Sequence, residues 1–108
     1  MAKVAIPEEI RQQVEAIVTQ FNKTELRGSV SYSVHFRGKF AYLDRTAYGK
    51  SGPICRLTYQ GEMDNWEFAI YKYSDDRYDA NEWFFPGSGE VNGTVVGAMR
   101  AGMAAYPA

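Results

Sequence analysis

The spacing of apolar residues near the start of the chain predicts an amphipathic helix over residues 7–22. Its apolar positions recur at intervals of three and four: Ile6, Ile10, Val14, Ile17, Val18 and Phe21. Such intervals place these side chains on one face of a helix. Pro7 suits the first helical position, and the acidic Glu8 and Glu9 complement the positive end of the helix dipole. We expect the apolar face to pack on a sheet.

After Gly28 the apolar period changes to two, which is typical of a half-buried strand. Residues 29–36 alternate strictly, and residues 39–46 return as a second strand after a turn at Arg37 and Gly38. A two-residue turn at this position would place Phe36 opposite Lys39 and Tyr32 opposite Leu43. The apolar faces of the two strands would then be continuous.

Two further strands are predicted over residues 54–60 and 66–73, after a loop over residues 47–53. Pairing Tyr59 with Trp66 places Cys55 opposite Ile70, which gives an apolar inner face. The opposite face then carries Arg56, Thr58, Glu67, Ala69, Tyr71 and Tyr73, of which all but Ala69 are polar or aromatic.

The remaining chain predicts a loop and a last helix over residues 94–105, with Asn92 or Thr94 as its N-cap. The apolar run over residues 82–86 should fold back on the sheet, as a loop or as a short fifth strand. The predicted fold class is α+β: an N-terminal helix, a four-stranded antiparallel meander and a C-terminal helix. Residues 1–108 form a single domain.

Small residues dominate the last helix, and Arg100 is its only charged residue. A helix with so few charges is poorly suited to face water on one side. Either the sheet and the aromatic loop enclose it, or a second copy of the chain covers it. The sequence therefore predicts a homodimer as one of two outcomes.

Composition narrows the classes of function. The chain has 108 residues, a formal net charge of -1 and one cysteine. One cysteine forms no internal disulfide, and a near-neutral chain lacks the positive charge that duplex nucleic acid or an anionic membrane attracts. No apolar run approaches the roughly 20 residues of a membrane span, and no secretory signal precedes Pro7. We expect a cytoplasmic protein without cofactors.

Two glycine-containing loops resemble phosphate sites only in part. The tripeptide Gly49-Lys50-Ser51 matches the end of a phosphate-binding loop, but Asp44 stands where that motif needs its first glycine, and a strand follows instead of a helix. Residues 87–93 lack the third glycine of a dinucleotide fingerprint. Both segments are expected to be ordinary loops.

The sequence predicts neither a catalytic set nor a metal site. His35 and Cys55 are the only residues of their kinds, and the strand pattern places them on opposite faces of the sheet. The acidic residues Asp75, Asp76, Asp79 and Glu82 lack the central glycine of a calcium loop, and a solvated loop is expected.

Aromatic and basic side chains are the most informative feature. The polar face of the predicted sheet carries Phe40 together with our candidate ligand-binding residues: His35, Arg37, Tyr42, Arg56, Tyr71 and Tyr73. Rings with basic neighbours can stack unpaired bases or a small ligand, and they also suit a protein partner. Alternatively, Trp83, Phe84, Phe85 and the last helix cover this face.

Three segments have a familiar composition: Phe36-Arg-Gly-Lys-Phe-Ala-Tyr-Leu43, Trp66-Glu-Phe-Ala-Ile-Tyr-Lys-Tyr73 and Glu82-Trp-Phe-Phe-Pro86. With Arg56-Leu-Thr-Tyr59 they resemble small bacterial and archaeal domains of unknown function. The resemblance covers roughly residues 30–86, and it implies the helix-plus-meander layout and no site residues.

The function that the sequence favours is a small non-enzymatic interaction module that binds a protein partner or a second copy of itself. The first alternative is binding of single-stranded nucleic acid or a small ligand on the aromatic and basic sheet face. The second alternative is a small enzyme that uses His35 with a carboxylate.

Overall fold

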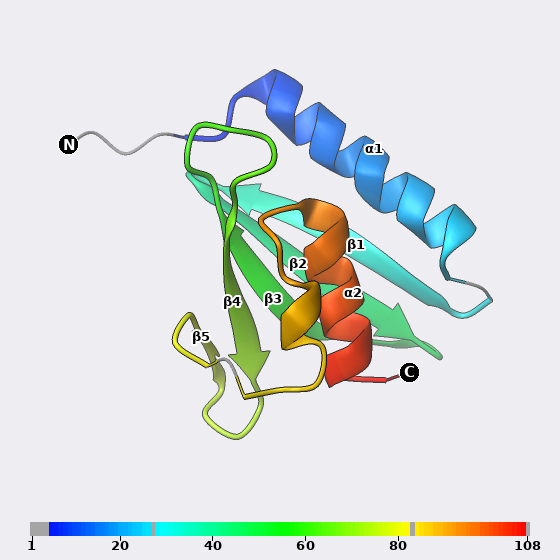
Figure 1. Ribbon diagram of the computed structural model, residues 1–108. Helices are drawn as coiled ribbons and strands as arrows, with labels where there is room; N and C mark the ends of the chain where they lie inside the picture. Colours follow the sequence, from blue (N-terminus) through cyan, green and yellow to red (C-terminus); the bar gives the residue numbers. More distant parts are fainter. Residues whose placement is uncertain (1–4, 27, 83, 108) are drawn as a thin grey trace.

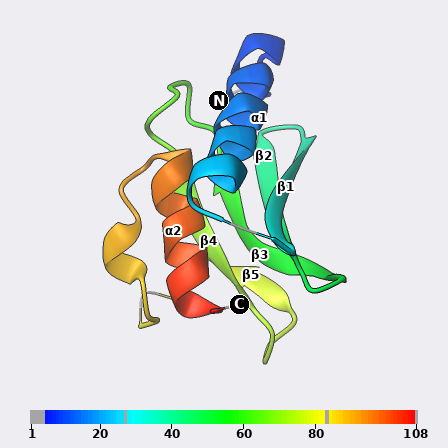
Figure 2. The same ribbon diagram turned by 90° about the vertical axis from the view of Figure 1, so that its right-hand side faces the viewer.

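Two helices lie on one face of a five-stranded antiparallel sheet with strand order β1-β2-β3-β4-β5 (Figures 1 and 2). The computed structural model describes residues 5–26, 28–82 and 84–107. Its elements are α1 (Glu8–Thr24), β1 (Val30–Arg37), β2 (Phe40–Ala47), β3 (Lys50–Thr58), β4 (Glu67–Lys72), β5 (Arg77–Asp79), the 3-10 turn η1 (Ser88–Glu90) and α2 (Val95–Ala105). The predicted α+β fold is confirmed.

The turn between β1 and β2 lies one residue later than the sequence pattern predicted. Arg37 pairs with Phe40, so the turn consists of Gly38 and Lys39. Gly38 has a φ of 62°, which a glycine adopts at the first position of a two-residue hairpin turn. Val34 therefore pairs with Leu43, and the predicted pairing of Tyr32 with Leu43 is wrong. The facing of both strands is as predicted, and so is the pairing of Cys55 with Ile70.

The fifth strand is formed by Arg77–Asp79, and Tyr71 pairs with Tyr78 across the β4–β5 turn. The predicted fifth strand over residues 82–86 is wrong for the described residues of that run, none of which is in a strand. Phe85 stacks on Phe68 with ring centroids 5.9 Å apart, so it packs on the helix side of the sheet. Phe84 is 98% exposed, and Trp83 lies outside the described residues.

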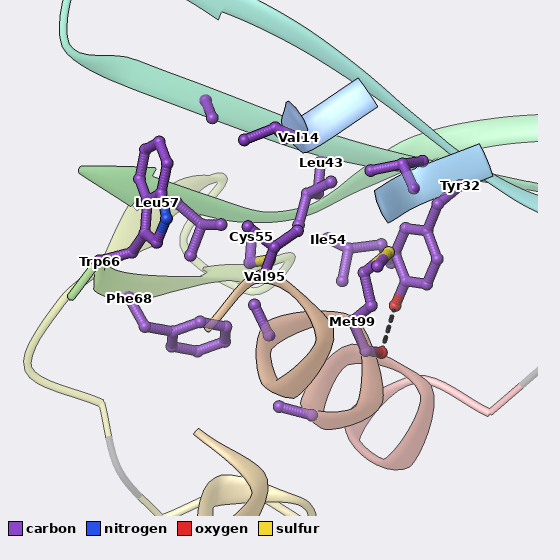
Figure 3. Packing of buried hydrophobic residues seen from close by; sticks show 14 of the residues in the cluster. Val14, Tyr32, Leu43, Ile54, Cys55, Leu57, Trp66, Phe68, Val95 and Met99 are labelled. Atoms are coloured by element: carbon purple, nitrogen blue, oxygen red, sulfur yellow. Dashed lines mark hydrogen bonds between the residues drawn. The ribbon is translucent and has the colours of Figure 1, made fainter. Parts of the chain in front are cut away.

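The core lies between the sheet and the two helices. From α1 it buries Val14, Val18 and Phe21, as the helical spacing predicted. The inner side chains of the sheet meet Val95 and Met99 of α2, and the Tyr32 hydroxyl donates a hydrogen bond to the Met99 carbonyl at 2.7 Å (Figure 3). α1 and α2 therefore share one core.

The small residues of α2 let the helix lie very close to β1 and β3. Thr94 caps its N-terminus, since its hydroxyl accepts a hydrogen bond from the Gly97 amide at 3.0 Å. A Cβ atom on Gly102 would collide with an Ile54 methyl group and the Tyr32 hydroxyl. The sheet and the neighbouring segments bury most of α2, which is the first of the two outcomes that the sequence left open.

An asparagine side chain ties α1 to β1, the long edge strand of the sheet. The Asn22 amide nitrogen donates to the Tyr32 carbonyl at 2.9 Å, and the Asn22 oxygen accepts from the Tyr32 amide at 2.8 Å. Asn22 thus satisfies both backbone groups of one residue of β1.

A β-bulge bends β3 at its middle. Leu43 pairs with Cys55 and Asp44 with Pro53, so Ile54 has no partner in β2. β2 itself keeps its alternation past the bulge, so Leu43 and Arg45 both face the helices.

No described helix is long and apolar enough to cross a membrane.

Candidate functional site

The sheet face opposite the helices, which we call the open face, carries a row of side chains across four strands. His35, Tyr42, Arg56 and Ala69 are successive register partners on β1, β2, β3 and β4. Register partners point to the same side of a sheet, so these side chains lie next to each other. α2 and Phe85 pack on the other face, and the expectation that they cover the open face is wrong.

Aromatic rings on the open face form a continuous cluster around Tyr42. Its ring stacks on His35 with centroids 4.9 Å apart and an interplanar angle of 10°. Phe40 lies 6.0 Å away and Tyr78 5.5 Å away, and Tyr71 meets Tyr78 edge to face at 5.0 Å. Arg37 is the register partner of Phe40. Five of the six candidate residues therefore belong to one surface, namely His35, Arg37, Tyr42, Arg56 and Tyr71.

Arg56 is held between two of these rings. Its guanidinium carbon lies 4.7 Å from the Phe40 centroid and 5.5 Å from the Tyr78 centroid, both within cation–π range. Its Nε is buried and has no hydrogen-bond partner in the structure. The rings thus hold a positive charge in a fixed position on the open face.

A hollow of about 430 Å³ lies at the end of the open face, beside the β1–β2 turn. Its side chains include two cations, Arg37 and Lys39, and two rings, Phe40 and Tyr42. Ala5 closes one side, and no carboxylate is among the described residues that line it. The Lys39 ammonium lies 5.5 Å from the Phe40 centroid. The hollow therefore offers ring faces together with uncompensated positive charge.

A histidine and a carboxylate meet on the open face. His35 Nδ1 lies 3.6 Å from the Asp44 carboxylate, and the His35 side chain is 61% exposed. Cys55 lies on the helix side, fully buried, and burial followed by the charge of Asp44 raises the pKa of its thiol far above the ordinary value. His35 and Cys55 therefore form no nucleophile pair, as the strand pattern predicted.

Tyr73 departs from the predicted position. It follows the end of β4, is 53% exposed, and its ring meets Tyr71 at 4.9 Å and Tyr106 at 5.3 Å. Its hydroxyl donates to the Pro53 carbonyl at 2.7 Å, and its side chain borders hollows on the helix side. Tyr73 thus lies at the rim of the sheet, because the chain leaves the strand after Lys72.

Two tyrosines of the open face are shifted toward the neutral form. A hydrogen bond to Asp76, followed by burial and the Asp76 charge, raises the pKa of Tyr71 from 10.0 to about 12. Burial, followed by the charge of Asp44, raises the pKa of Tyr78 from 10.0 to about 12. Both hydroxyls therefore keep their protons in the folded protein at a pH where an unfolded chain loses them.

We expect the free energy of unfolding to be independent of these two tyrosines below pH 10 and to fall between pH 10 and about 12. In that window the unfolded state loses tyrosine protons that the folded state retains. Urea unfolding across this range measures the fall. Tyr78→Phe should flatten the curve, and Tyr48→Phe, at the exposed β2–β3 turn, should not. Equal slopes in both variants would contradict the assignment.

Two residues of the open face were absent from the predicted set, Tyr78 and Lys39. Tyr78 lies in the polar stretch after β4, where only the turn residues Ser74, Asp75 and Asp76 between two tyrosine-containing segments signal a hairpin. Lys39 was placed in a strand opposite Phe36, and the structure places it in the turn.

The acidic stretch after β4 forms ion pairs and is not gathered as a metal site. Lys72 Nζ lies 3.5 Å from Asp75, 3.9 Å from Asp79 and 3.3 Å from Glu82. No group of three or more potential metal ligands occurs among residues 5–26, 28–82 and 84–107.

Comparisons of the chain with protein-family models, curated proteins and solved structures gave no match.

Proposed function

We propose that this protein is a non-enzymatic binding module whose open face binds single-stranded nucleic acid. One observation carries the proposal: the aromatic cluster and the cations share the sheet face that the helices leave uncovered. Stacking on aromatic side chains, with positive charge for the phosphates, is how sheet surfaces bind unpaired bases.

The residues divide this task by position. The rings of Phe40 and Tyr42 offer stacking surfaces, and Arg37 and Lys39 lie in the same hollow, where they would meet backbone phosphates. Arg56 adds charge at the centre of the face, between two rings. Two carboxylates share this face: Glu67 lies on β4, away from the hairpin that carries Arg37 and Lys39, and Asp44 lies on β2 beside His35.

Duplex nucleic acid does not fit this proposal. A sheet face is too broad to enter a groove, and the bases of a duplex are stacked on each other. The net charge of -1 gives little general attraction for a polyanion. Binding should therefore depend more on stacking than on the count of phosphate contacts.

Fluorescence anisotropy with labelled single-stranded oligonucleotides tests the proposal. We expect binding at about 50 mM salt, and a logarithmic salt slope near -2, since about three cations meet phosphates. Tyr42→Ala should weaken binding about tenfold or more, because each stacked base contributes about 1–3 kcal/mol. Arg37→Gln should weaken it and reduce the salt slope.

The matched control is Tyr48→Ala, which removes an exposed tyrosine from the β2–β3 turn. It should bind as the unchanged protein does, and a duplex of the same sequence should bind more weakly. No change in anisotropy at about 100 µM protein and low salt would reject nucleic acid as the ligand. The open face would then be assigned to a protein partner, for which tyrosine and arginine are also favoured contacts.

Self-association and a cytoplasmic location remain part of the proposal. Since most of α2 is buried within the chain, a homodimer would need another surface. Sedimentation near 50–100 µM, about the range in which a weak dimer forms, measures the oligomeric state.

A buried lone cysteine is compatible with the cytoplasm.

A further inference from the structure

The helix side of the β2–β3 hairpin contains a buried cation without an acidic partner. Arg45 is only 9% exposed, and its guanidinium donates to the Met103 sulfur at 3.4 Å. Among the described residues no carboxylate lies within ion-pair distance of Arg45, whereas Arg11, Arg77 and Arg100 each have at least one. Burying a charge is costly unless an opposite charge or good hydrogen bonds accompany it.

The neighbours of Arg45 compensate this charge only in part. A thioether is a weak acceptor, and the nearby Tyr32 hydroxyl, which donates to the Met99 carbonyl and accepts from Arg45, carries no charge. The last turn of α2 contributes at most about half a negative charge. Lys50 adds a second positive charge on the same side of the hairpin. Ala47 lies two positions after Arg45 and so faces the same side, and Lys50 is the register partner of Ala47.

A hollow of about 200 Å³ lies between these two cations. Ser51, Gly52 and Tyr73 also line it, and none of its lining residues is acidic. A Cβ on Gly52 would lie 2.7 Å from the Tyr73 hydroxyl, so the absence of a side chain there lets Tyr73 form one wall of the hollow. The hydrogen bond from Tyr73 to the Pro53 carbonyl holds the far wall in place.

We propose that Arg45 and Lys50 bind a phosphate group in this hollow. A guanidinium can donate two parallel hydrogen bonds to a phosphate, and an ammonium adds a compact charge. The Ser51 hydroxyl, which shares a hydrogen bond with the Thr46 hydroxyl at 2.6 Å, lies on the open face and takes no part in this site. The ligand is free phosphate or the phosphate of a small phosphomonoester.

The tripeptide Gly49-Lys50-Ser51 does not form the phosphate-binding loop that its sequence resembles in part. Tyr48 and Gly49 form a hairpin turn, with φ of 53° and 85°, and Lys50 and Ser51 begin β3, so no helix N-terminus presents amides to a ligand. Side chains would hold the phosphate instead. The site lies on the helix side of the sheet and does not depend on ligand binding at the open face.

Amide chemical shifts followed during titration with sodium phosphate, at ionic strength held constant with sodium chloride, test this site. We expect saturable shifts at residues 45–52 with a dissociation constant of about 1 mM, and a thermal midpoint that rises with phosphate. Lys50→Gln should weaken binding about tenfold. Lys50 is exposed, so this variant should fold. Arg45→Gln should abolish binding.

The control is Lys23→Gln, in the last turn of α1, which should leave the titration unchanged. A parallel titration with glycerol phosphate separates the two sources: tighter binding than phosphate indicates a phosphomonoester, and equal or weaker binding indicates free phosphate. The same shifts in a separate titration with sodium chloride alone, or an equal response of Lys50→Gln and Lys23→Gln, would mean an adventitious ion only and would overturn the proposal.

Discussion

Replacing Gly102 by valine is expected to lower the free energy of unfolding by about 3 kcal/mol or more. The first added carbon already collides with an Ile54 methyl group and the Tyr32 hydroxyl, and the valine methyl groups extend further into the same contact. α2 must then move away from the sheet. The buried hydrogen bond from Tyr32 to Met99 would be stretched or lost, which costs about 1 kcal/mol more.

Urea unfolding of Gly102→Val measures this loss, and Gly89→Val is the matched control. Gly89 lies in η1, and an added Cβ there meets no atom within 4 Å. The control should change stability by about 0.5 kcal/mol or less. If both variants unfolded at the same urea concentration, the close approach of α2 to Ile54 would be wrong.

Leu43→Ala should cost about 2–5 kcal/mol, because it opens a cavity where the strands and helices meet. Leu43 is fully buried on β2, and it faces Val95 and Met99 of α2 in the shared core (Figure 3). For a domain of this size the thermal midpoint should fall by about 10 °C or more.

Phe84→Ala provides the comparison for Leu43→Ala, since it removes a larger apolar side chain that is 98% exposed. Its thermal midpoint should stay within about 2 °C of the unchanged protein. A Leu43→Ala variant as stable as Phe84→Ala would show that β2 does not face the helices as described.

The helices and the facing of the strands followed from the periods of the apolar residues. A strand turned by one residue would expose its whole apolar set, so facing is strongly determined. A shift of two residues keeps the facing, and the apolar pattern therefore could not locate the β1–β2 turn. The decisive signal was the position of Gly38, because a tight turn of this kind needs a positive φ at its first residue.

Which side of the sheet the second helix covers could not be predicted, because it depends on contacts between residues far apart in the chain. The hydrogen bond from Tyr32 to Met99 joins residues 67 positions apart, and no local pattern announces it. The same limitation applies to the open face. Its members on β1, β2 and β3 were identified from alternation, whereas Tyr78 joins them only through the pairing of β4 with β5.

The two hydrogen bonds between Asn22 and β1 affect how readily other copies of the chain can add a strand to the sheet at high protein concentration. A long edge strand is a template to which another chain can add a strand, and this is how ordered aggregates grow. At Tyr32, in the first half of β1, the side-chain amide of Asn22 already occupies a donor and an acceptor that an incoming strand would need. The opposite edge, β5, is only three residues long. Both margins of the sheet thus resist extension, and association is directed to its broad surfaces.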